Sequence, residues 1–330
     1  MNFIETIKER ARKNVKKIVL PEASDLRIIK ATATVLEEKY AEIVLLGNEQ
    51  EINKMAKENN LNISQATIIN PKTADNSEEY AEKLYELRKA KGMTLEQAKE
   101  LVKDEVYYGM MMVKCGEADG LVSGAVHSTS DTLRPALQIL KTAPGTKLVS
   151  AFFLMVVPNC EYGEDGVFVF GDCGLNQNPT AEELAEIANS SSKSFETLVG
   201  KESKVAMLSY STMGSAKSEL TEKVIEATRI VKENYPELKV DGELQLDAAI
   251  VPEIGKSKAP NSKIAGHANT LIFPNLDAGN IGYKLTQRLG KAEAYGPLCQ
   301  GIARPVNDLS RGCSAEDIAG VVAITCVQCM

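Results

Sequence analysis

The sequence predicts an α/β protein whose sheets are largely parallel. Short runs rich in Val, Ile and Leu alternate with helical patterns along most of the chain. With 330 residues and 44% hydrophobic composition, the chain has enough apolar material for roughly two or three domains. Several of the apolar runs end in turn-forming or polar residues, and the loops beyond such strands are where open α/β sheets bind ligands.

The expected strands are short and evenly distributed. We place them at 17–20, 43–46, 66–69, 120–123, 167–170, 205–208 and 270–273. A longer apolar run at 148–157 is interrupted by Ser150 and falls well short of the roughly 18 residues needed to cross a bilayer. We therefore expect a buried strand there and no association with a membrane.

Helical patterns fill the gaps between these strands. Residues 1–12 form an amphipathic pattern with acidic residues among the basic ones, unlike a signal or transit peptide, so we expect a cytoplasmic protein. The stretch between 76 and 114 predicts two helices, 78–91 and 94–112, divided by Gly92.

The carboxyl-terminal segment predicts an anion site at the start of a helix. Ser314 and Asp317 have the spacing of a capping box, and the apolar run 318–324 follows them. Ser310 and Arg311 lie just ahead of this helix start. Free backbone N–H groups and the helix dipole attract anions there, and an arginine can bind phosphate or carboxylate through two parallel hydrogen bonds.

A second segment, 127–134, also suits an anion. It places several hydroxyl side chains after a strand and Arg134 on the helix that follows. When this segment is considered alone, an ordinary Ser/Thr helix cap is the slightly favoured interpretation. Arg88, near the end of the helix expected at 78–91, is by its spacing an ordinary solvated or salt-bridged residue.

Composition argues against several function classes. The net charge of −7 provides no general basic surface for nucleic acid. Seven cysteines at scattered positions do not resemble a disulfide framework, and Cys326 and Cys329 form a C-x-x-C without a second pair, so we expect reduced thiols and no zinc. The chain has two histidines, and His267 beside a strand is more typical of a structural residue. No P-loop, dinucleotide-binding glycine motif, zinc-protease or serine-hydrolase motif occurs.

Three segments together resemble phosphate acetyltransferase, also called phosphotransacetylase, in its short form. They are residues 119–134, 266–284 and 296–317. The resemblance runs nearly from end to end of the chain, and the combination of segments is highly specific.

The resemblance implies a fold and a reaction. It implies two α/β domains with a cleft between them, similar to isocitrate and isopropylmalate dehydrogenases, with 1–147 plus 300–330 as the first domain and 148–299 as the second. It implies a homodimer that converts acetyl-CoA and phosphate to CoA and acetyl phosphate, reversibly and by direct transfer in a ternary complex. Coenzyme A is then a substrate, and no metal and no tightly bound cofactor are expected.

The resemblance also implies roles for particular residues. The catalytic serine, arginine and aspartate fall on Ser310, Arg311 and Asp317. The arginines for CoA and phosphate fall on Arg88 and Arg134. We add Ser128, Thr129 and Asn269 as candidate substrate-binding residues.

The chemistry of these side chains suggests a mechanism with one difficulty. Asp317 would take the thiol proton, Ser310 would donate to the developing oxyanion, and Arg311 would neutralise phosphate or the carbonyl oxygen. A carboxylate near a helix start and beside an arginine should have a lowered pKa, whereas a base for a thiol of pKa about 8.5 needs a raised one. Asp317 is therefore either a base that is buried during turnover or a residue that caps the helix and orients Arg311.

Other mechanisms and functions stay open at this point. Cys160 or Cys313 could carry the acyl group, although Glu161 follows Cys160 and no histidine is close in sequence to either. The same machinery could serve butyryl phosphate. An NAD(P)-dependent decarboxylating dehydrogenase of the related fold would need clustered metal-binding aspartates, and a non-catalytic CoA- or phosphate-binding module is a third alternative.

Overall fold

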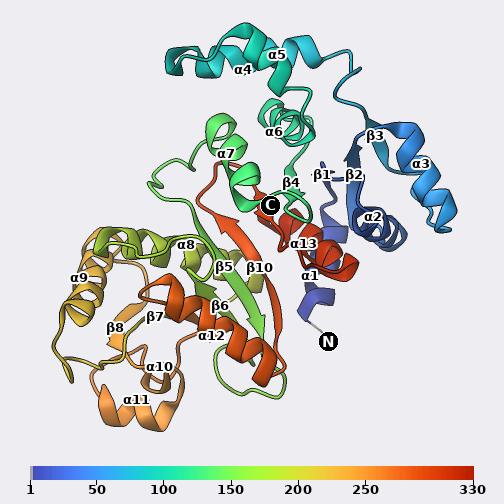
Figure 1. The fold of residues 1–330 in the computed structure, drawn as a ribbon. Coiled ribbons are helices and arrows are strands. Elements are labelled where there is room, and N and C mark those ends of the chain that lie inside the picture. Colours follow the sequence, from blue (N-terminus) through green and yellow to red (C-terminus); the bar gives the residue numbers. More distant parts are fainter. Residues whose placement is uncertain (1–2) are drawn as a thin grey trace. The chain divides into compact units, whose positions relative to one another are not determined.

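The computed structural model describes residues 3–330, which form two compact units (Figure 1). Unit 1 consists of the chain up to Pro144 together with the segment Ile302–Met330. Unit 2 is Gly145–Gly301. Residues 1–2 of the amphipathic pattern expected at 1–12 lie outside the described part, and α1 covers the remainder. In the described chain, no helix is long and apolar enough to cross a membrane.

Unit 1 is built on a parallel sheet with strand order β11-β4-β1-β2-β3. Its strands are β1 (Lys16–Leu20), β2 (Ala41–Leu46), β3 (Thr67–Ile69), β4 (Gly120–Ser123) and β11 (Val306–Asp308). Its helices are α1 (Phe3–Lys13), α2 (Leu26–Glu38), α3 (Glu49–Glu58), α4 (Ser77–Arg88), α5 (Leu95–Leu101), α6 (Glu105–Cys115), α7 (Thr129–Ile139) and α13 (Ala315–Gln328), with a short 3-10 turn η1 (Lys89–Lys91).

The central strands of unit 1 are buried on both faces because helices cover both. Ile18, Val19 and Leu20 of β1 are each fully buried, as expected for a parallel strand with helices on either side. Helices α1, α2 and α13 pack together, and α4, α6 and α7 form a second group in contact with one another. The carboxyl-terminal helix α13 therefore completes the layer that begins with α1.

The helical stretch after β3 differs from the prediction in one place. We expected one helix over 94–112, but α5 ends at Leu101 and α6 begins at Glu105. Asp104 caps the second helix by accepting hydrogen bonds from the N–H groups of Val106 and Tyr107. An aspartate at this position favours a new helix start over continuation.

Unit 2 is built on a mixed sheet with strand order β10-β5-β6-β9-β7-β8. Its strands are β5 (Ser150–Val156), β6 (Val167–Gly171), β7 (Val205–Leu208), β8 (Val240–Leu244), β9 (Thr270–Ile272) and β10 (Glu293–Gln300). Its helices are α8 (Ala181–Val199), α9 (Glu219–Asn234), α10 (Leu246–Ile250), α11 (Pro252–Lys258) and α12 (Leu276–Leu289).

The sheet of unit 2 is only partly parallel. Strand β5 runs antiparallel to both β6 and β10, and the remaining pairs are parallel. The short connection from β5 to β6 explains this, because neighbouring parallel strands need a crossover of a dozen or more residues. Two apolar clusters pack in this unit: one includes α8 and α9 residues such as Leu184 and Val224, and the other includes Phe153 and Phe170.

Candidate active site

The loops after β1, β4 and β11 lie at one edge of the unit 1 sheet. These three strands are neighbours and run parallel, so their carboxyl ends meet at that edge. Ser123 at the end of β4 pairs in register with Asp308 at the end of β11, and the Leu309 N–H donates to the Ser123 carbonyl at 2.7 Å. Ligands of open α/β sheets bind beyond this edge.

A glycine allows the loops after β4 and β11 to approach closely. Gly124 has a φ of +109°, and a Cβ built on it would lie 2.4 Å from the Leu309 nitrogen and 2.5 Å from Asp308 Oδ1. Any other residue would need both a strained backbone and a shift of the neighbouring loop. The loop that leads to Ser310 is thus packed directly on the end of β4.

Asp308 is a buried carboxylate beside this contact. Thr129 Oγ1 donates to its Oδ2 at 2.6 Å, and Oδ1 has no hydrogen-bond partner within residues 3–330. Burial raises the pKa of Asp308 to about 6, although the Thr129 hydrogen bond opposes the shift. The Thr129 bond fastens the start of α7 to the end of β11.

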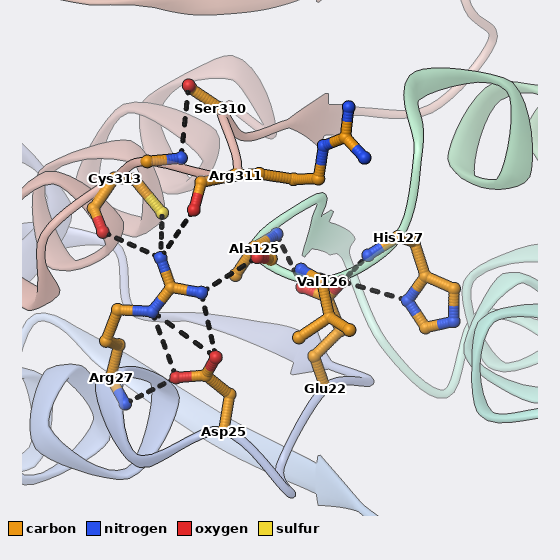
Figure 2. A network of polar contacts seen from close by, with 10 residues as sticks. Glu22, Asp25, Arg27, Ala125, Val126, His127, Ser310, Arg311 and Cys313 are labelled. Carbon is orange, nitrogen blue, oxygen red and sulfur yellow. Dashed lines mark hydrogen bonds and ion pairs between the residues drawn. The ribbon is translucent and has the colours of Figure 1, made fainter.

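Arg27, at the start of α2, connects three loops (Figure 2). Its Nη1 donates to the carbonyl oxygens of Arg311 at 2.8 Å and Cys313 at 2.9 Å, and its Nη2 donates to the carbonyl of Ala125 at 2.8 Å. Asp25 holds the same guanidinium through an ion pair at 2.8 Å and also caps α2. Arg27 therefore fixes the backbone that carries Ser310 and Arg311 relative to the end of β4.

Glu22, in the loop after β1, holds the other side of the β4 loop. Its carboxylate accepts hydrogen bonds from the backbone N–H groups of Ala125, Val126 and His127 at 2.8–2.9 Å, and from His127 Nδ1 at 2.9 Å. Burial alone would raise the pKa of Glu22, but these hydrogen bonds keep it below its ordinary value. The same contact raises the pKa of His127.

Ser310, Arg311 and Asp317 are all exposed at this edge. The predicted capping box is confirmed, because the Asp317 N–H donates to Ser314 Oγ at 3.1 Å and the Ser314 N–H donates to Asp317 Oδ2 at 2.9 Å. Ser310 Oγ accepts a long hydrogen bond of 3.4 Å from the Gly312 N–H. The Arg311 side chain runs away from Arg27 and meets none of the other residues drawn in Figure 2.

Arg88 and Arg134 lie near one tyrosine of α6. Tyr107 donates to Gln138 of α7 at 3.0 Å. Burial raises the pKa of Tyr107, and the positive charges of Arg134 and Arg88 both oppose that rise, so both guanidinium groups are within electrostatic range of its ring. The end of α4 and the middle of α7 thus bring these two arginines to the same region.

The three arginines expected to bind anions lack carboxylate partners. Over residues 3–330, Arg88, Arg134 and Arg311 form no salt bridge, and Arg88 Nε is buried without a hydrogen-bond partner. A buried unpaired donor is costly, so such a group is typical of a site that a ligand completes.

Ser128 and Thr129 have internal partners in the structure. Ser128 caps α7 and donates to Asp131 Oδ2 at 2.6 Å, and Thr129 donates to Asp308. The helix cap that we weighed as the simpler interpretation is therefore present. Both hydroxyl protons and the Ser128 N–H are used within the chain, which leaves oxygen lone pairs and the backbone N–H of Thr129 for a ligand.

Asn269 lies in unit 2 directly before β9, at the amino end of that strand. Its side chain is buried and accepts from the Lys204 N–H at 2.8 Å while donating to the Glu202 carbonyl at 3.0 Å. These bonds fix the turn before β7. Asn269 thus belongs to unit 2, whereas the other expected site residues belong to unit 1.

The cysteines are all free in the structure. Burial raises the pKa of Cys313 to about 11, although the Arg27 charge opposes the shift. Burial likewise raises the pKa values of Cys326 and Cys329, which end α13. No group of three or more His, Cys, Asp or Glu side chains within residues 3–330 is arranged to hold a metal ion.

Sequence reasoning missed the residues that assemble this edge. Glu22, Arg27 and Asp308 were not among the expected site residues. The one available signal was the turn-forming run 21–24 directly after a strand, at the position where α/β sheets place their ligand loops.

The chain matches the family described as "Phosphate acetyl/butaryl transferase" over residues 2–326. It is 65% identical to the phosphate acetyltransferase of Acetivibrio thermocellus over 99% of this chain and 98% of that protein. It is 48% identical to the phosphate acetyltransferase of Bacillus subtilis, over 100% of this chain and 99% of that protein.

Solved structures of phosphotransacetylases are similar to this chain in fold and in sequence. A phosphotransacetylase from Streptococcus pyogenes superposes with a TM-score of 0.93 at 46% identity, covering 99% of this chain and 98% of that one. The EutD phosphotransacetylase from Staphylococcus aureus superposes with a TM-score of 0.92 at 44% identity, covering 100% and 98%. At 10% identity and a TM-score of 0.57, a 4-hydroxythreonine-4-phosphate dehydrogenase homologue from Salmonella typhimurium is similar in fold alone.

Proposed function

Because the chain belongs to the phosphate acetyl/butyryl transferase family, and is therefore an acyltransferase, we propose that it transfers an acetyl group reversibly between coenzyme A and inorganic phosphate. One observation in the structure carries the proposal. Arg88, Arg134 and Arg311 of unit 1 form no salt bridge with any described residue, and the reaction must hold two anionic substrates together.

The reaction proceeds by direct attack in a ternary complex. The CoA thiol loses its proton to Asp317, and the sulfur attacks the carbonyl carbon of acetyl phosphate. Ser310 donates to the carbonyl oxygen as negative charge develops there, and Arg311 neutralises the phosphate. A positioned base contributes about 10²–10⁴ in rate and one oxyanion donor about 10²–10³, so alignment of the two substrates supplies much of the remainder.

The surroundings of Asp317 sharpen its proposed role. It is exposed, and one oxygen already accepts a hydrogen bond from the Ser314 N–H at 2.9 Å. Water competes with a thiol for an exposed carboxylate oxygen. Proton removal by Asp317 therefore requires that bound CoA excludes water from it, and turnover of the Asp317→Asn enzyme tests this requirement.

A covalent acetyl-cysteine route has less support. Cys313 is buried with a pKa raised to about 11, so its thiolate is scarce at neutral pH. Its closest charged contact, Arg27 Nη1 at 3.9 Å, is already engaged with backbone carbonyls. Retained activity in a Cys160→Ala, Cys313→Ala double variant supports direct transfer.

The remaining substrate contacts divide by position. Arg88 and Arg134 bind phosphate groups of CoA or the transferred phosphate. Ser128 and Thr129 form the start of α7, so their contribution to substrate comes through the Thr129 N–H and the placement of Arg134. Asn269 has the least support as a substrate ligand, because both polar atoms of its amide are bonded within unit 2.

Thioester formation from acetyl phosphate and CoA, with and without a chelator, tests the proposal. We expect turnover in both conditions. Loss of activity with chelator contradicts metal-independent chemistry, and CoA binding without turnover indicates a binding module. Parallel assays with butyryl phosphate and with NAD(P) and a 2-hydroxy acid separate the acetyl transferase from a butyryl transferase or a decarboxylating dehydrogenase.

We also propose a homodimer. Three large apolar side chains of α12, Ile281, Leu285 and Leu289, recur every four residues and are more than half exposed, with Leu289 at 79%. Such a stripe on one helix face is typical of a surface that another chain covers. Sedimentation of the wild type as a dimer and of Leu285→Glu as a monomer supports this surface, and an unchanged dimer in the variant contradicts it.

Seven free cysteines suit a reducing compartment, which supports a cytoplasmic location. No tightly bound cofactor is required, because coenzyme A and phosphate enter as substrates. The net charge of −7 provides no general basic surface for nucleic acid, so the binding of anionic substrates must be local.

A further inference from the structure

His127 lies at the carboxyl end of β4 with a buried carboxylate on one side of its ring and an open face on the other. Its Nδ1 is 2.9 Å from Glu22 Oε1, and its side chain is 31% exposed while that of Glu22 is 1% exposed. No residue in the range 3–330 bonds to its Nε2. The ring therefore offers Nε2 to a ligand.

The orientation of this ring is fixed by Glu22. Three consecutive backbone N–H groups, from Ala125 to His127, hold the Glu22 carboxylate in place. In the neutral ring Nδ1 carries the proton that is shared with Glu22, which leaves the Nε2 lone pair free to accept a proton. In the imidazolium form Nε2 becomes a donor. This carboxylate and imidazole pair can thus exchange one proton at a defined atom.

The neighbours of His127 place it at the same edge of the unit 1 sheet as the proposed site. The two residues that follow it begin α7, which carries Arg134. The loop with Ser310 and Arg311 follows the adjacent strand β11. Asp317, the proposed base for the thiol, lies one turn into the helix beyond that loop.

The proposed reaction needs a second proton site. In thioester formation a proton leaves the thiol, and another must reach the phosphate oxygen that departs from the acetyl carbon. Asp317 accounts only for the proton that leaves the thiol. We propose that His127 Nε2 donates the second proton to the departing phosphate and, in the reverse direction, takes it from the attacking phosphate. This inference rests on the proposed function.

The S–H bond of CoA breaks and its proton goes to the Asp317 carboxylate. A bond forms between sulfur and the acetyl carbon, and the bond between that carbon and the phosphate oxygen breaks with its electron pair on the oxygen. The Nε2–H proton of imidazolium His127 goes to that oxygen, giving hydrogen phosphate. Solvent then removes the proton from Asp317 and restores one to His127.

The charges around His127 suit this role. Three carboxylates act on the ring: Glu22 from the loop after β1 through a hydrogen bond, and Asp104 from the start of α6 and Asp131 from the first turn of α7 through their charge. The hydrogen bond to Glu22 is the main cause of the raised pKa, and the other two add to it. Imidazolium therefore persists above pH 6.5, the ordinary value.

The direction of the pH effect follows from the raised pKa. The proton donor exists below the folded-state pKa of His127 and is lost as the pH rises through it. Thioester formation should therefore slow as the pH rises through a value above 6.5. The reverse reaction needs neutral His127 and should become faster over the same interval.

Two substitutions of His127 test the proposal against a matched control. In His127→Asn the amide can replace Nδ1–H toward Glu22, but nothing occupies the position of Nε2. His127→Gln places an amide near Nε2 that cannot titrate. His267→Asn, which changes the chain's other histidine in unit 2, is the control.

We expect His127→Asn to lower kcat by about 100-fold, the low end for a positioned acid or base, and to abolish the high-pH decline of thioester formation. His127→Gln should behave similarly, and the KM for CoA should change by less than about threefold in both. His267→Asn should retain wild-type turnover and pH dependence.

Nuclear magnetic resonance of the histidine ring protons provides a readout that does not depend on turnover. With two histidines in the chain, the signal that survives in His267→Asn belongs to His127. We expect its titration midpoint in the wild type to lie above 6.5 and to move higher with saturating inorganic phosphate, because a nearby dianion stabilises imidazolium.

Three results overturn the proposal. They are a His127→Asn enzyme with turnover within about threefold of wild type, a slowed enzyme whose pH profile keeps its shape, and a His127 midpoint that phosphate does not move. The second result reduces His127 to a positioning residue. A wild-type chain that forms no thioester contradicts the proposed function itself, and the phosphate titration then still shows whether His127 binds phosphate.

Discussion

Glu22 in unit 1 and Asp172 in unit 2 are both 2% exposed, and each holds a loop by accepting several backbone hydrogen bonds. Glu22 accepts from the N–H groups of residues 125–127. Asp172, just after β6, accepts from those of Gly174, Leu175 and Asn176 and from Ala151 on the neighbouring strand, at 2.8–3.2 Å. Burial removes the water that would solvate each carboxylate. Backbone N–H groups replace that water as hydrogen-bond donors, which lowers the cost of burying the charge.

The two differ in the side chain that each holds. The side-chain partner of Asp172 is the amide of Asn176, which donates to it at 2.7 Å and also to the Val149 carbonyl at 3.2 Å. Glu22 instead holds His127, whose Nε2 is open. A buried carboxylate therefore marks a reactive loop only when it polarises a titratable group that a ligand can reach.

We expect the largest loss of turnover from a substitution at the edge of the unit 1 sheet. Asp317→Asn should lower kcat by about 100-fold or more, because the variant cannot accept the thiol proton. Asparagine retains an oxygen that can accept from the Ser314 N–H, so the capping box and the fold should survive. Steady-state kinetics with acetyl phosphate and CoA, together with circular dichroism, measure the two properties separately.

Glu316→Gln is the matched control for this change. Glu316 is an exposed carboxylate in the same first turn of α13, and its loss should alter kcat by less than about twofold. Near-normal turnover in Asp317→Asn would leave Asp317 as a helix cap and assign thiol ionisation to another group.

A smaller loss should follow from loosening the network around Arg27. In Arg27→Lys a single ammonium replaces a planar group that reaches carbonyls of three residues. We expect kcat to fall by roughly tenfold, about 1.4 kcal/mol, because Ser310 and Arg311 lose their fixed position. Guanidinium ion added at low concentration should partly restore an Arg27→Ala enzyme.

Arg229→Lys in unit 2 is the control for the general effect of replacing an arginine with lysine. Arg229 is 53% exposed and pairs with Glu226 and Glu233 on its own helix, so its replacement should leave turnover unchanged. If Arg27→Lys behaves like Arg229→Lys, the loops of unit 1 hold their positions without this guanidinium.

The sequence was sufficient for what depends on neighbouring residues. The capping box of Ser314 and Asp317 and the short apolar strands follow from spacing, and both are present. The resemblance of three segments to phosphate acetyltransferases identified the family. Local pattern could not show that Asp317 is exposed, since exposure depends on which parts of the fold cover it.

The residues that assemble the site depend on contacts distant in sequence. Arg27 bonds to a carbonyl 286 residues away, and Glu22 bonds to N–H groups 103–105 residues away. Hydrophobic periodicity carries no information about such pairs. The reversed direction of β5 was missed for a related reason, because an apolar run alone does not show which way a strand runs.

The unit 2 carboxylate should affect stability and leave turnover nearly unchanged. Asp172→Asn turns one acceptor into an amide N–H₂ group that faces backbone donors, which costs about 2–3 kcal/mol for unsatisfied buried groups. At about 2–4 °C per kcal/mol, the melting temperature should fall by roughly 5–10 °C. At 25 °C kcat should remain within about twofold, since no proposed catalytic group contacts Asp172.

Asp247→Asn, at a half-exposed carboxylate paired with Lys258, should change neither property appreciably. If Asp172→Asn lowered kcat as much as Asp317→Asn without lowering the melting temperature, the loop after β6 would belong to the catalytic machinery and the distinction between the two carboxylates would fail.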